Sequence, residues 1–134
     1  LESGRAAERF ARMVHALGGP ADLLERIDAH LPRAPVTRPV PMPMDGTVAG
    51  YDTRALGLGV VALGGGRTRP GDPVDPAVGL ADIASIGANL RRGEPVAMVH
   101  ACDEAGADAA IIRVLEALRI GEAKAGPAVL ERIG

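Results

Sequence analysis

Aromatic residues and cysteine are nearly absent from this sequence. Its 134 residues include one Phe, one Tyr and no Trp, so aliphatic side chains must fill the core of a chain that is 47% hydrophobic. The scarcity of aromatic rings also excludes the stacking platforms that bind single-stranded nucleic acid. The single cysteine, Cys102, excludes an internal disulfide, which fits a protein of the reducing cytoplasm.

An excess of one charge and a long apolar run are lacking as well. The formal net charge is −2, so no strong field attracts nucleic acid or an anionic membrane surface. No apolar run reaches the roughly 20 residues that span a bilayer, and no signal-peptide pattern is present. We therefore expect no nucleic acid and no membrane among the partners, and a cytoplasmic location.

The first thirty residues have helical patterns. The opening stretch LESGRAAERF has no Met and already follows a helical pattern, so we expect the chain to be part of a longer polypeptide. Apolar residues at helical spacing predict a helix over 4–17, with Ser3 as its N-cap. The stretch GGP that follows would end this helix, and a shorter helix is predicted over 22–30.

The composition of the chain changes between residues 32 and 43, where five prolines occur. Because proline fixes φ and lacks an N–H group, this segment must be extended, with few ladder bonds of its own. We place a module boundary near residue 35. The stretch MDGTVAGY then predicts a turn at Asp45-Gly46 and a strand over 47–51.

A helix is predicted over 53–63, capped by Asp52 or Thr53, and a Gly/Pro-rich loop over 64–79. The residues expected on the buried face of this helix are Leu56, Val60 and Leu63. Gly57 and Gly59 each cost about 1 kcal/mol against Ala in a helix interior, a cost that close packing would explain.

Strands and a second clear helix fill the rest of the chain. We predict a strand or extended segment over 80–86, turns over 87–95, a strand buried on both faces over 96–101, and a further strand or extended edge over 125–134. A helix is predicted over 104–119, with an apolar stripe of Ile111, Val114, Leu115 and Leu118 and a solvent side of Asp108, Arg113, Glu116 and Arg119. This mixed order of helices and strands indicates an α+β fold.

The stretch VVALGGGRTR (60–69) is the first candidate site. Phosphate-binding loops place their glycines between a strand and a helix N-terminus, where free N–H groups meet the anion. Here the capping residues precede the apolar run and the glycines follow it, so Gly64 would cap a helix C-terminus. We therefore expect no phosphate cradle. Arg67 and Arg69 could touch an anion or an acidic surface, although a solvated flexible loop is the simpler interpretation.

The other residues that could carry chemistry are scattered. His15, His30 and His100 have no partners at metal-ligand spacing, so no metal site is predicted. Cys102 would be a small buried hydrophobic residue, because the Asp-Glu pair that follows it opposes a thiolate. That acidic pair would begin a helix, where it complements the helix dipole. We predict no catalytic residue.

The stretch PVPMPMDGTVAG resembles the opening strand of biotinyl and lipoyl carrier domains. Such domains hold their cofactor on a lysine in a hairpin, which Met or Asp usually flanks. Lys124 is the only lysine of this chain, and it stands in EAKAG without a matching hairpin. A carrier-like module would therefore lack its carrier lysine.

Three longer stretches together resemble the C-terminal part of the thymidine and pyrimidine-nucleoside phosphorylase family. They are GRAAERFARMVHALGGPADLLE, YDTRALGLGVVALGGGRTRPGDPVDPAVGL and RRGEPVAMVHA, and they follow the order of the family over nearly the whole chain. The resemblance implies an α+β C-terminal module of the α/β-hammerhead or barrel-sandwich type over 35–134. The helical segment over 1–34 would end the large α/β domain of the parent enzyme.

The resemblance also implies a reaction. Inorganic phosphate, as co-substrate, attacks the anomeric carbon of a pyrimidine nucleoside and releases the base and a pentose 1-phosphate, without a cofactor. The family's phosphate loop, K-x-S-x-G-G-x-G-D, and its base-binding Arg, Ser and Lys do not occur in this sequence, so we assign no catalytic or substrate-binding residue. The implied partner is the remainder of the phosphorylase chain, in an enzyme that forms a homodimer.

Within this family context the glycine-arginine loop is a candidate closure loop beside an interdomain cleft. Its residues are Gly64, Gly65, Gly66, Arg67 and Arg69. In isolation we expect the chain to be structural and inactive, with this loop poorly ordered. The alternative is an independent binding or scaffold module, which would associate through the proline segment or through a patch left by a missing partner domain.

Overall fold

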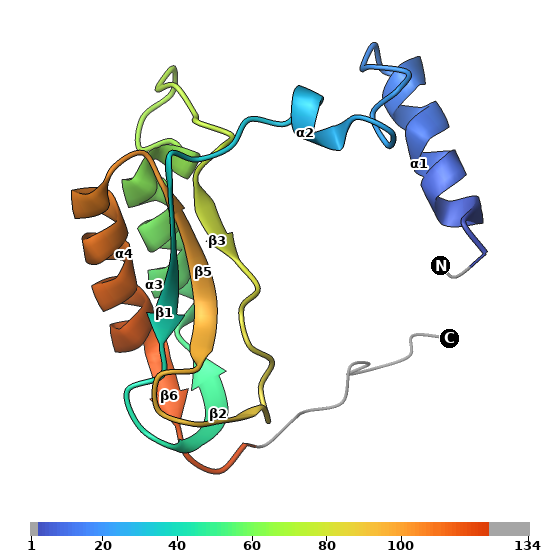
Figure 1. Ribbon diagram of the computed structural model, residues 1–134. Coiled ribbons are helices and arrows are strands. Elements are labelled where there is room, and N and C mark those ends of the chain that lie inside the picture. Colours follow the sequence, from blue (N-terminus) through green and yellow to red (C-terminus); the bar gives the residue numbers. More distant parts are fainter. Residues whose placement is uncertain (1–2, 124–134) are drawn as a thin grey trace, which may run out of the picture. The chain divides into compact units, whose positions relative to one another are not determined.

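The computed structural model describes residues 3–123 and divides the chain into two compact units, Leu1–Arg33 and Ala34–Gly134. Both units are shown in Figure 1. Helices and small antiparallel sheets occur together, which confirms the predicted α+β class. Within the described residues, no helix has the length and apolar character needed to cross a membrane.

The first unit contains α1 (Arg5–Ala16) and the single turn α2 (Ile27–His30). The first predicted helix is confirmed, but its N-cap is Gly4 rather than Ser3. Gly4 is left-handed, with φ of 73°, and its carbonyl accepts the first bond of the helix, so Ser3 lies one residue too early to cap it. The second predicted helix is shorter than expected, because turns occupy residues 21–25.

A three-stranded sheet in the order β1-β5-β3 forms the centre of the second unit. Its strands are β1 (Val36–Pro41), β5 (Pro95–Ala101) and β3 (Gly79–Ala81), all antiparallel to their neighbours. The proline segment is extended as predicted, and it pairs with β5 along its length. It lies at the edge of the sheet, where a missing N–H group costs no ladder bond. The central strand β5 confirms the buried strand predicted over 96–101.

A second small sheet has the order β4-β2-β6, with β4 (Asn89–Leu90), β2 (Gly46–Tyr51) and β6 (Leu118–Ile120). β2 confirms the strand predicted after the turn. β6 corrects the prediction that the last helix reaches residue 119, because Leu118 pairs opposite Tyr51 and takes an extended conformation. Within residues 3–123 the two sheets do not close into a barrel.

Two connecting segments also differ from the prediction. The strand expected over 80–86 ends at Ala81, because Asp82 has a left-handed φ of 49° that no regular strand accommodates. The turn-rich segment over 87–95 contains the short strand β4. The further strand expected over 125–134 lies outside the described residues.

Helices α3 (Thr53–Val60) and α4 (Glu104–Ala117) cover one face of the β1-β5-β3 sheet (Figure 1). The buried core between α4 and the sheet consists of Val40, Ala97, Val99, Ala101, Ala107, Ala110 and Val114. The predicted stripe of α4 was centred on larger side chains, but only Val114 of that stripe is fully buried. Ile111 and Leu115 pack at its margin, while alanines face the sheet.

Polar contacts at the edge of this core are exposed. The Arg38 guanidinium of β1 lies 2.6 Å from the Asp108 carboxylate and 3.1 Å from that of Glu104, both on α4. Exposed ion pairs contribute at most about 1 kcal/mol each. Apolar packing rather than charge therefore holds α4 on the sheet.

The helical segment formed by α3 and the turn after it begins and ends where the capping residues predict. The Asp52 carboxylate accepts a bond of 2.9 Å from the Ala55 N–H, and Gly57 lies inside the helix with no neighbouring atom within 4 Å of an added Cβ. One π-helical turn, Val61–Gly65, continues the helix until Gly64 ends it with a left-handed φ of 97°. Close packing therefore does not explain Gly57, whereas Gly59 is buried.

Alanine substitutions at Gly57 and Gly64 should have opposite effects on stability. Gly57→Ala should raise the free energy of unfolding by about 0.5–1 kcal/mol, because it removes backbone entropy at an open helical position. Gly64→Ala should lower it by about 1–2 kcal/mol, because a Cβ is unfavourable in the left-handed region. Urea unfolding of the two variants measures both changes. A stabilising Gly64→Ala change would contradict the assigned helix end.

Candidate functional site

The glycine-arginine loop begins at the C-terminal end of the α3 helical segment, which presents carbonyl groups. The Gly64 carbonyl accepts a bond of 2.9 Å from the Asp75 N–H on the far side of the loop. A Cβ on Gly65 would lie 2.9 Å from a Val60 methyl, and one on Gly66 would lie 2.7 Å from a Val61 methyl. The glycines therefore serve the turn itself, since they let the chain fold back closely onto α3.

Asp72 organises the interior of the loop. One of its carboxylate oxygens accepts bonds from the Thr68 hydroxyl at 2.7 Å, the Arg69 N–H at 2.8 Å and the Thr68 N–H at 3.2 Å. Its backbone carbonyl accepts a bond of 3.0 Å from Arg67 Nε. The Thr68 hydroxyl, with the two N–H groups, lowers the pKa of Asp72. These hydrogen bonds between Asp72 and residues 67–69 are called the Asp72 frame below. The sequence analysis did not predict them.

The far end of the loop is attached to the end of β5 through Cys102. The Cys102 thiol donates to the Asp75 carboxylate at 3.2 Å, and the other carboxylate oxygen accepts from the Ala77 N–H at 2.8 Å. Cys102 is exposed, so the prediction of a buried residue was wrong. It follows Ala101 directly, at the point where the chain leaves the sheet and enters the turn before α4.

The prediction that acidic neighbours oppose a thiolate at Cys102 was correct, since the pKa of its thiol is raised. Bonding to Asp75 raises the pKa of the Cys102 thiol, with smaller contributions from desolvation and from the charges of Asp75 and Asp103. Asp103 acts mainly as the N-cap of α4, where its carboxylate accepts a bond of 2.7 Å from the Gly106 N–H. The thiol is therefore held protonated and serves as a hydrogen-bond donor to the loop.

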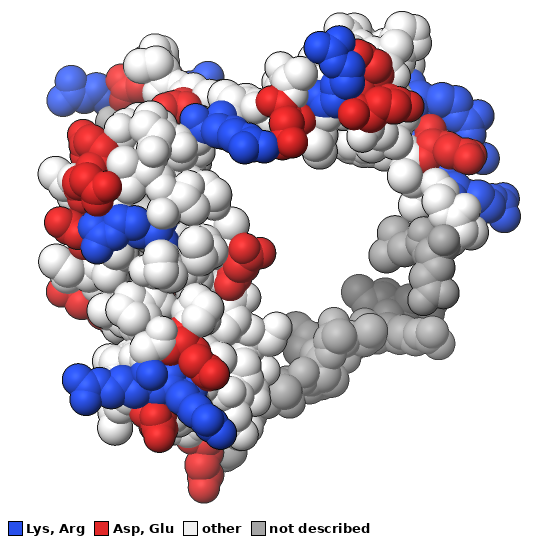
Figure 2. Space-filling model, in the orientation of Figure 1, with Lys and Arg blue, Asp and Glu red and all other residues white. Residues whose placement is uncertain are grey.

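The cationic side chains of the loop are exposed. Both Arg67 and Arg69 are exposed, and neither forms an ion pair with another residue that the structure describes. On the face shown in Figure 2, acidic and basic side chains lie close to one another. The site can present two guanidinium groups to an anion.

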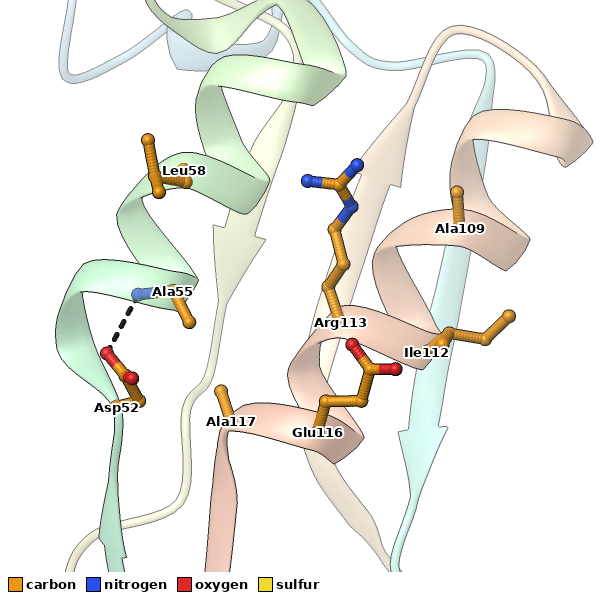
Figure 3. A pocket seen from close by; sticks show the side chains of 8 residues that line it. All are labelled: Asp52, Ala55, Leu58, Ala109, Ile112, Arg113, Glu116 and Ala117. Carbon is orange, nitrogen blue, oxygen red and sulfur yellow. Dashed lines mark hydrogen bonds between the residues drawn. The ribbon is translucent and has the colours of Figure 1, made fainter.

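A groove of about 480 Å³ lies between α3 and α4 (Figure 3). It is lined by Asp52, Ala55, Leu58, Ala109, Ile112, Arg113, Glu116 and Ala117. The Asp52 carboxylate is engaged in capping α3, as the dashed line in Figure 3 shows. The remaining lining is mainly aliphatic, and we assign no catalytic role to this groove.

Two of the three histidines contact a polar side chain of their own unit. His30 Nε2 lies 2.7 Å from the Asp22 carboxylate, and His100 Nδ1 lies 3.3 Å from the Thr37 hydroxyl. Among residues 3–123, no group of three or more His, Cys, Asp or Glu side chains could hold a metal ion. Lys124, which we weighed as a carrier lysine, lies outside the described residues.

The Asp72 frame predicts a pH dependence of the loop. Because the pKa of Asp72 is lowered in the folded chain, its bonds contribute fully above the ordinary Asp value of about 3.9 and are lost as the pH falls through the lowered value. The amide resonances of Thr68 and Arg69 should therefore titrate together, with a midpoint below that ordinary value, in an NMR titration. The titration should disappear in Asp72→Ala, whereas a midpoint above the ordinary value would contradict the frame.

Comparison with known proteins places these features in a family. Residues 47–121 match the family described as "Pyrimidine nucleoside phosphorylase C-terminal domain". The chain is 54% identical over 134 residues to a thymidine phosphorylase of Burkholderia cenocepacia, 48% identical over 135 residues to one of Sinorhizobium fredii, and 46% identical over 135 residues to one of Agrobacterium fabrum. Each alignment covers 99% of this chain and 31% of the relative. The chain therefore belongs to the pyrimidine nucleoside phosphorylase C-terminal domain family.

Proposed function

We propose that this chain is the C-terminal part of a thymidine or related pyrimidine-nucleoside phosphorylase. The observation that carries the proposal is the 54% identity to a thymidine phosphorylase along 99% of the chain. The reaction is the transfer of the pentose from a pyrimidine base to inorganic phosphate, the co-substrate. No cofactor is required, and the enzyme works in the cytoplasm as a homodimer.

The chemistry of this enzyme is supplied by the remainder of the phosphorylase chain. The described loop offers two arginines and no acid or base that is poised for catalysis, and the α3–α4 groove is mainly aliphatic. The family's lysine-containing phosphate loop has no counterpart here, since the only lysine is Lys124. We infer that the isolated chain is structural and inactive.

The order of elements in the second unit supports a hammerhead arrangement. Two strands precede α3, three strands lie between α3 and α4, and the strands form two small antiparallel sheets. We assign residues 35–134 to this α/β-hammerhead module, with a likeness to barrel-sandwich domains. Residues 1–34 are assigned to the end of the large domain of the parent enzyme.

The glycine-arginine loop acts in closure of the active-site cleft. Phosphorolysis depends on positioning and on stabilising negative charge, and exposed guanidinium groups suit both tasks. The Asp75 N–H bond to the Gly64 carbonyl and the Cys102 thiol bond to Asp75 hold the base of the loop, and the bonds to Asp72 hold its interior. The Arg67 and Arg69 side chains remain exposed, with Arg67 Nε bonded to the Asp72 carbonyl. A loop that is fixed at its base and exposes Arg67 and Arg69 is suited to contact a bound anion when the domains close.

A chimera tests both parts of the proposal. This chain would replace the matching last third of the Burkholderia cenocepacia thymidine phosphorylase. The chimera should phosphorolyse thymidine, and the double substitution Arg67→Ala with Arg69→Ala should lower kcat/KM about 10-fold, equivalent to about 1.4 kcal/mol of transition-state stabilisation. Steady-state assays with thymidine and phosphate measure both results.

The matched control is Arg91→Ala with Arg92→Ala, which removes the same charge from two exposed arginines in a turn of the second unit. This control should leave kcat/KM unchanged. A closure role is ruled out if the two double variants have equal kinetics. An inactive chimera that is folded would rule out the enzymatic assignment of the chain.

A further inference from the structure

The two arginines of the loop are held in different ways. Arg67 Nε donates a bond of 3.0 Å to the Asp72 carbonyl. Of Arg69 only the backbone N–H is bonded, to the Asp72 carboxylate at 2.8 Å, and its side chain forms no hydrogen bond or ion pair within the described residues. The Arg67 guanidinium is therefore fixed at one nitrogen before any ligand arrives, whereas the Arg69 guanidinium is not.

The bond at Nε leaves the end of the Arg67 side chain available. The donors that remain are those of Nη1 and Nη2, which bond no other residue that the structure describes. These two groups lie in one plane and can donate two parallel bonds to two oxygens of the same anion. The acceptor at Nε is a neutral carbonyl, so no carboxylate among the described residues neutralises the guanidinium.

Asp72 holds the backbone that places this carbonyl. Its N–H donates a bond of 3.2 Å to the Arg69 carbonyl across residues 70 and 71, a proline and a glycine, and the glycine has a left-handed φ of 94°. This sequence and φ are typical of a type II turn. The Asp72 carboxylate closes the same turn through its bonds to the Thr68 hydroxyl, the Thr68 N–H and the Arg69 N–H. The turn and the Arg67 bond therefore form one arrangement, whose contacts all lie inside the loop.

The reaction proposed above identifies an anion for this fork. A pyrimidine nucleoside and its base are uncharged at neutral pH, whereas inorganic phosphate and a pentose 1-phosphate each present a phosphoryl group with several oxygens. Two N–H donors on one guanidinium match that group in charge and in geometry. Because Arg67 is already held at Nε, it loses less side-chain freedom on binding than Arg69 would.

We propose that Arg67 binds the phosphoryl group of the reaction through its two Nη groups, and that Asp72 is the residue that positions Arg67. Arg69 contributes charge without a fixed geometry. This inference rests on the proposed function and deepens it, because closure of the loop then completes the binding site for the phosphoryl group rather than for the pyrimidine.

The substitution Arg67→Lys in the chimera tests the fork, because it keeps the positive charge but removes the Nε bond and the paired donors. The KM for phosphate should rise about 10-fold, with less than about a 2-fold change in the KM for thymidine. Arg69→Lys should raise the KM for phosphate by about 2-fold at most. Arg91→Lys, at an exposed arginine outside the loop, is the matched control and should change neither value. Equal effects of the two loop substitutions would overturn the proposal.

Variants of Asp72 separate positioning from charge. By charge alone, removal of a carboxylate near an anion site lowers the KM for phosphate. Asp72→Ala should instead raise it about 10-fold, because the arrangement that holds Arg67 is lost. Asp72→Asn keeps an acceptor oxygen for the same donors and should limit the rise to about 3-fold. Asp72→Ala added to Arg67→Lys should have little further effect. An unchanged or lower KM in Asp72→Ala would overturn the positioning role.

NMR of the isolated chain tests the geometry without catalysis. The Nε–H of Arg67 should exchange with water about 10-fold more slowly than that of Arg69, because it is bonded to a carbonyl. Its resonance is identified by its loss in Arg67→Lys. The protection should disappear in Asp72→Ala and persist in Asp72→Asn. Equal exchange of the two Nε–H groups would contradict the assigned positioning.

The remaining outcomes separate this inference from the proposed function. Phosphorolysis by the chimera with an unchanged KM for phosphate in Arg67→Lys overturns this inference alone. A folded chimera without phosphorolysis overturns both. A fall in kcat without a change in the KM for phosphate would indicate a carboxylate of the facing domain as the acceptor and overturn the assignment to a phosphoryl group.

Assays in the reverse direction distinguish the two sources of the phosphoryl group. If the KM for the pentose 1-phosphate also rises in Arg67→Lys, the fork binds the group in both reactants. If only the KM for inorganic phosphate rises, the fork binds free phosphate. Both results support the proposal, whereas a rise confined to the pentose 1-phosphate would overturn the predicted effect on phosphate binding.

Discussion

The contact between α4 and the central strand β5 is the interaction on which the second unit depends. Ala107 and Ala110 of the helix belong to the same buried core as Ala97 and Ala101 of the strand. A chain with one Phe and no Trp cannot fill space with large rings. Small side chains instead let two backbones approach closely, and close packing then recovers dispersion energy. The other strands of the sheet pair on either side of β5, and α3 lies against α4.

The geometry of the glycine-arginine loop follows from that same contact. β5 ends at Ala101 and α4 begins at Glu104, so the short turn between them is fixed at both ends. Cys102 lies in this turn and bonds Asp75 of the loop. The left-handed conformation of Gly64 sets the other end of the loop. The core thus fixes both ends of the loop, at Gly64 and at the bond between Cys102 and Asp75. The exposed Arg67 and Arg69 lie between these two ends, although neither belongs to the core.

Sequence patterns correctly predicted the structural elements that depend only on residues close together in the sequence. Proline content predicted the extended β1, the acidic pair Asp103-Glu104 predicted the start of α4, and the order of cap and glycines predicted that the loop leaves a helix C-terminus. Long-range contacts caused the errors. β6 replaces the last helical turn because Leu118 pairs with Tyr51, and the bond between Cys102 and Asp75 joins residues far apart in the sequence. Periodicity also gives little weight to alanine, so the predicted stripe of α4 included Val114, Ile111 and Leu115 but missed the buried alanines beside them.

The prolines of β1 have a consequence for the order in which the chain is made. Val36 pairs with Ala101, so β1 is synthesised long before its partner strand leaves the ribosome. An unpaired strand edge is a template for association with other chains, and this hazard is greatest while folding is incomplete. Pro39 and Pro41 remove donors from that edge, so the waiting segment is a poor template for intermolecular sheets. The residues that confine β1 to the edge of the finished sheet therefore also protect the nascent chain from aggregation.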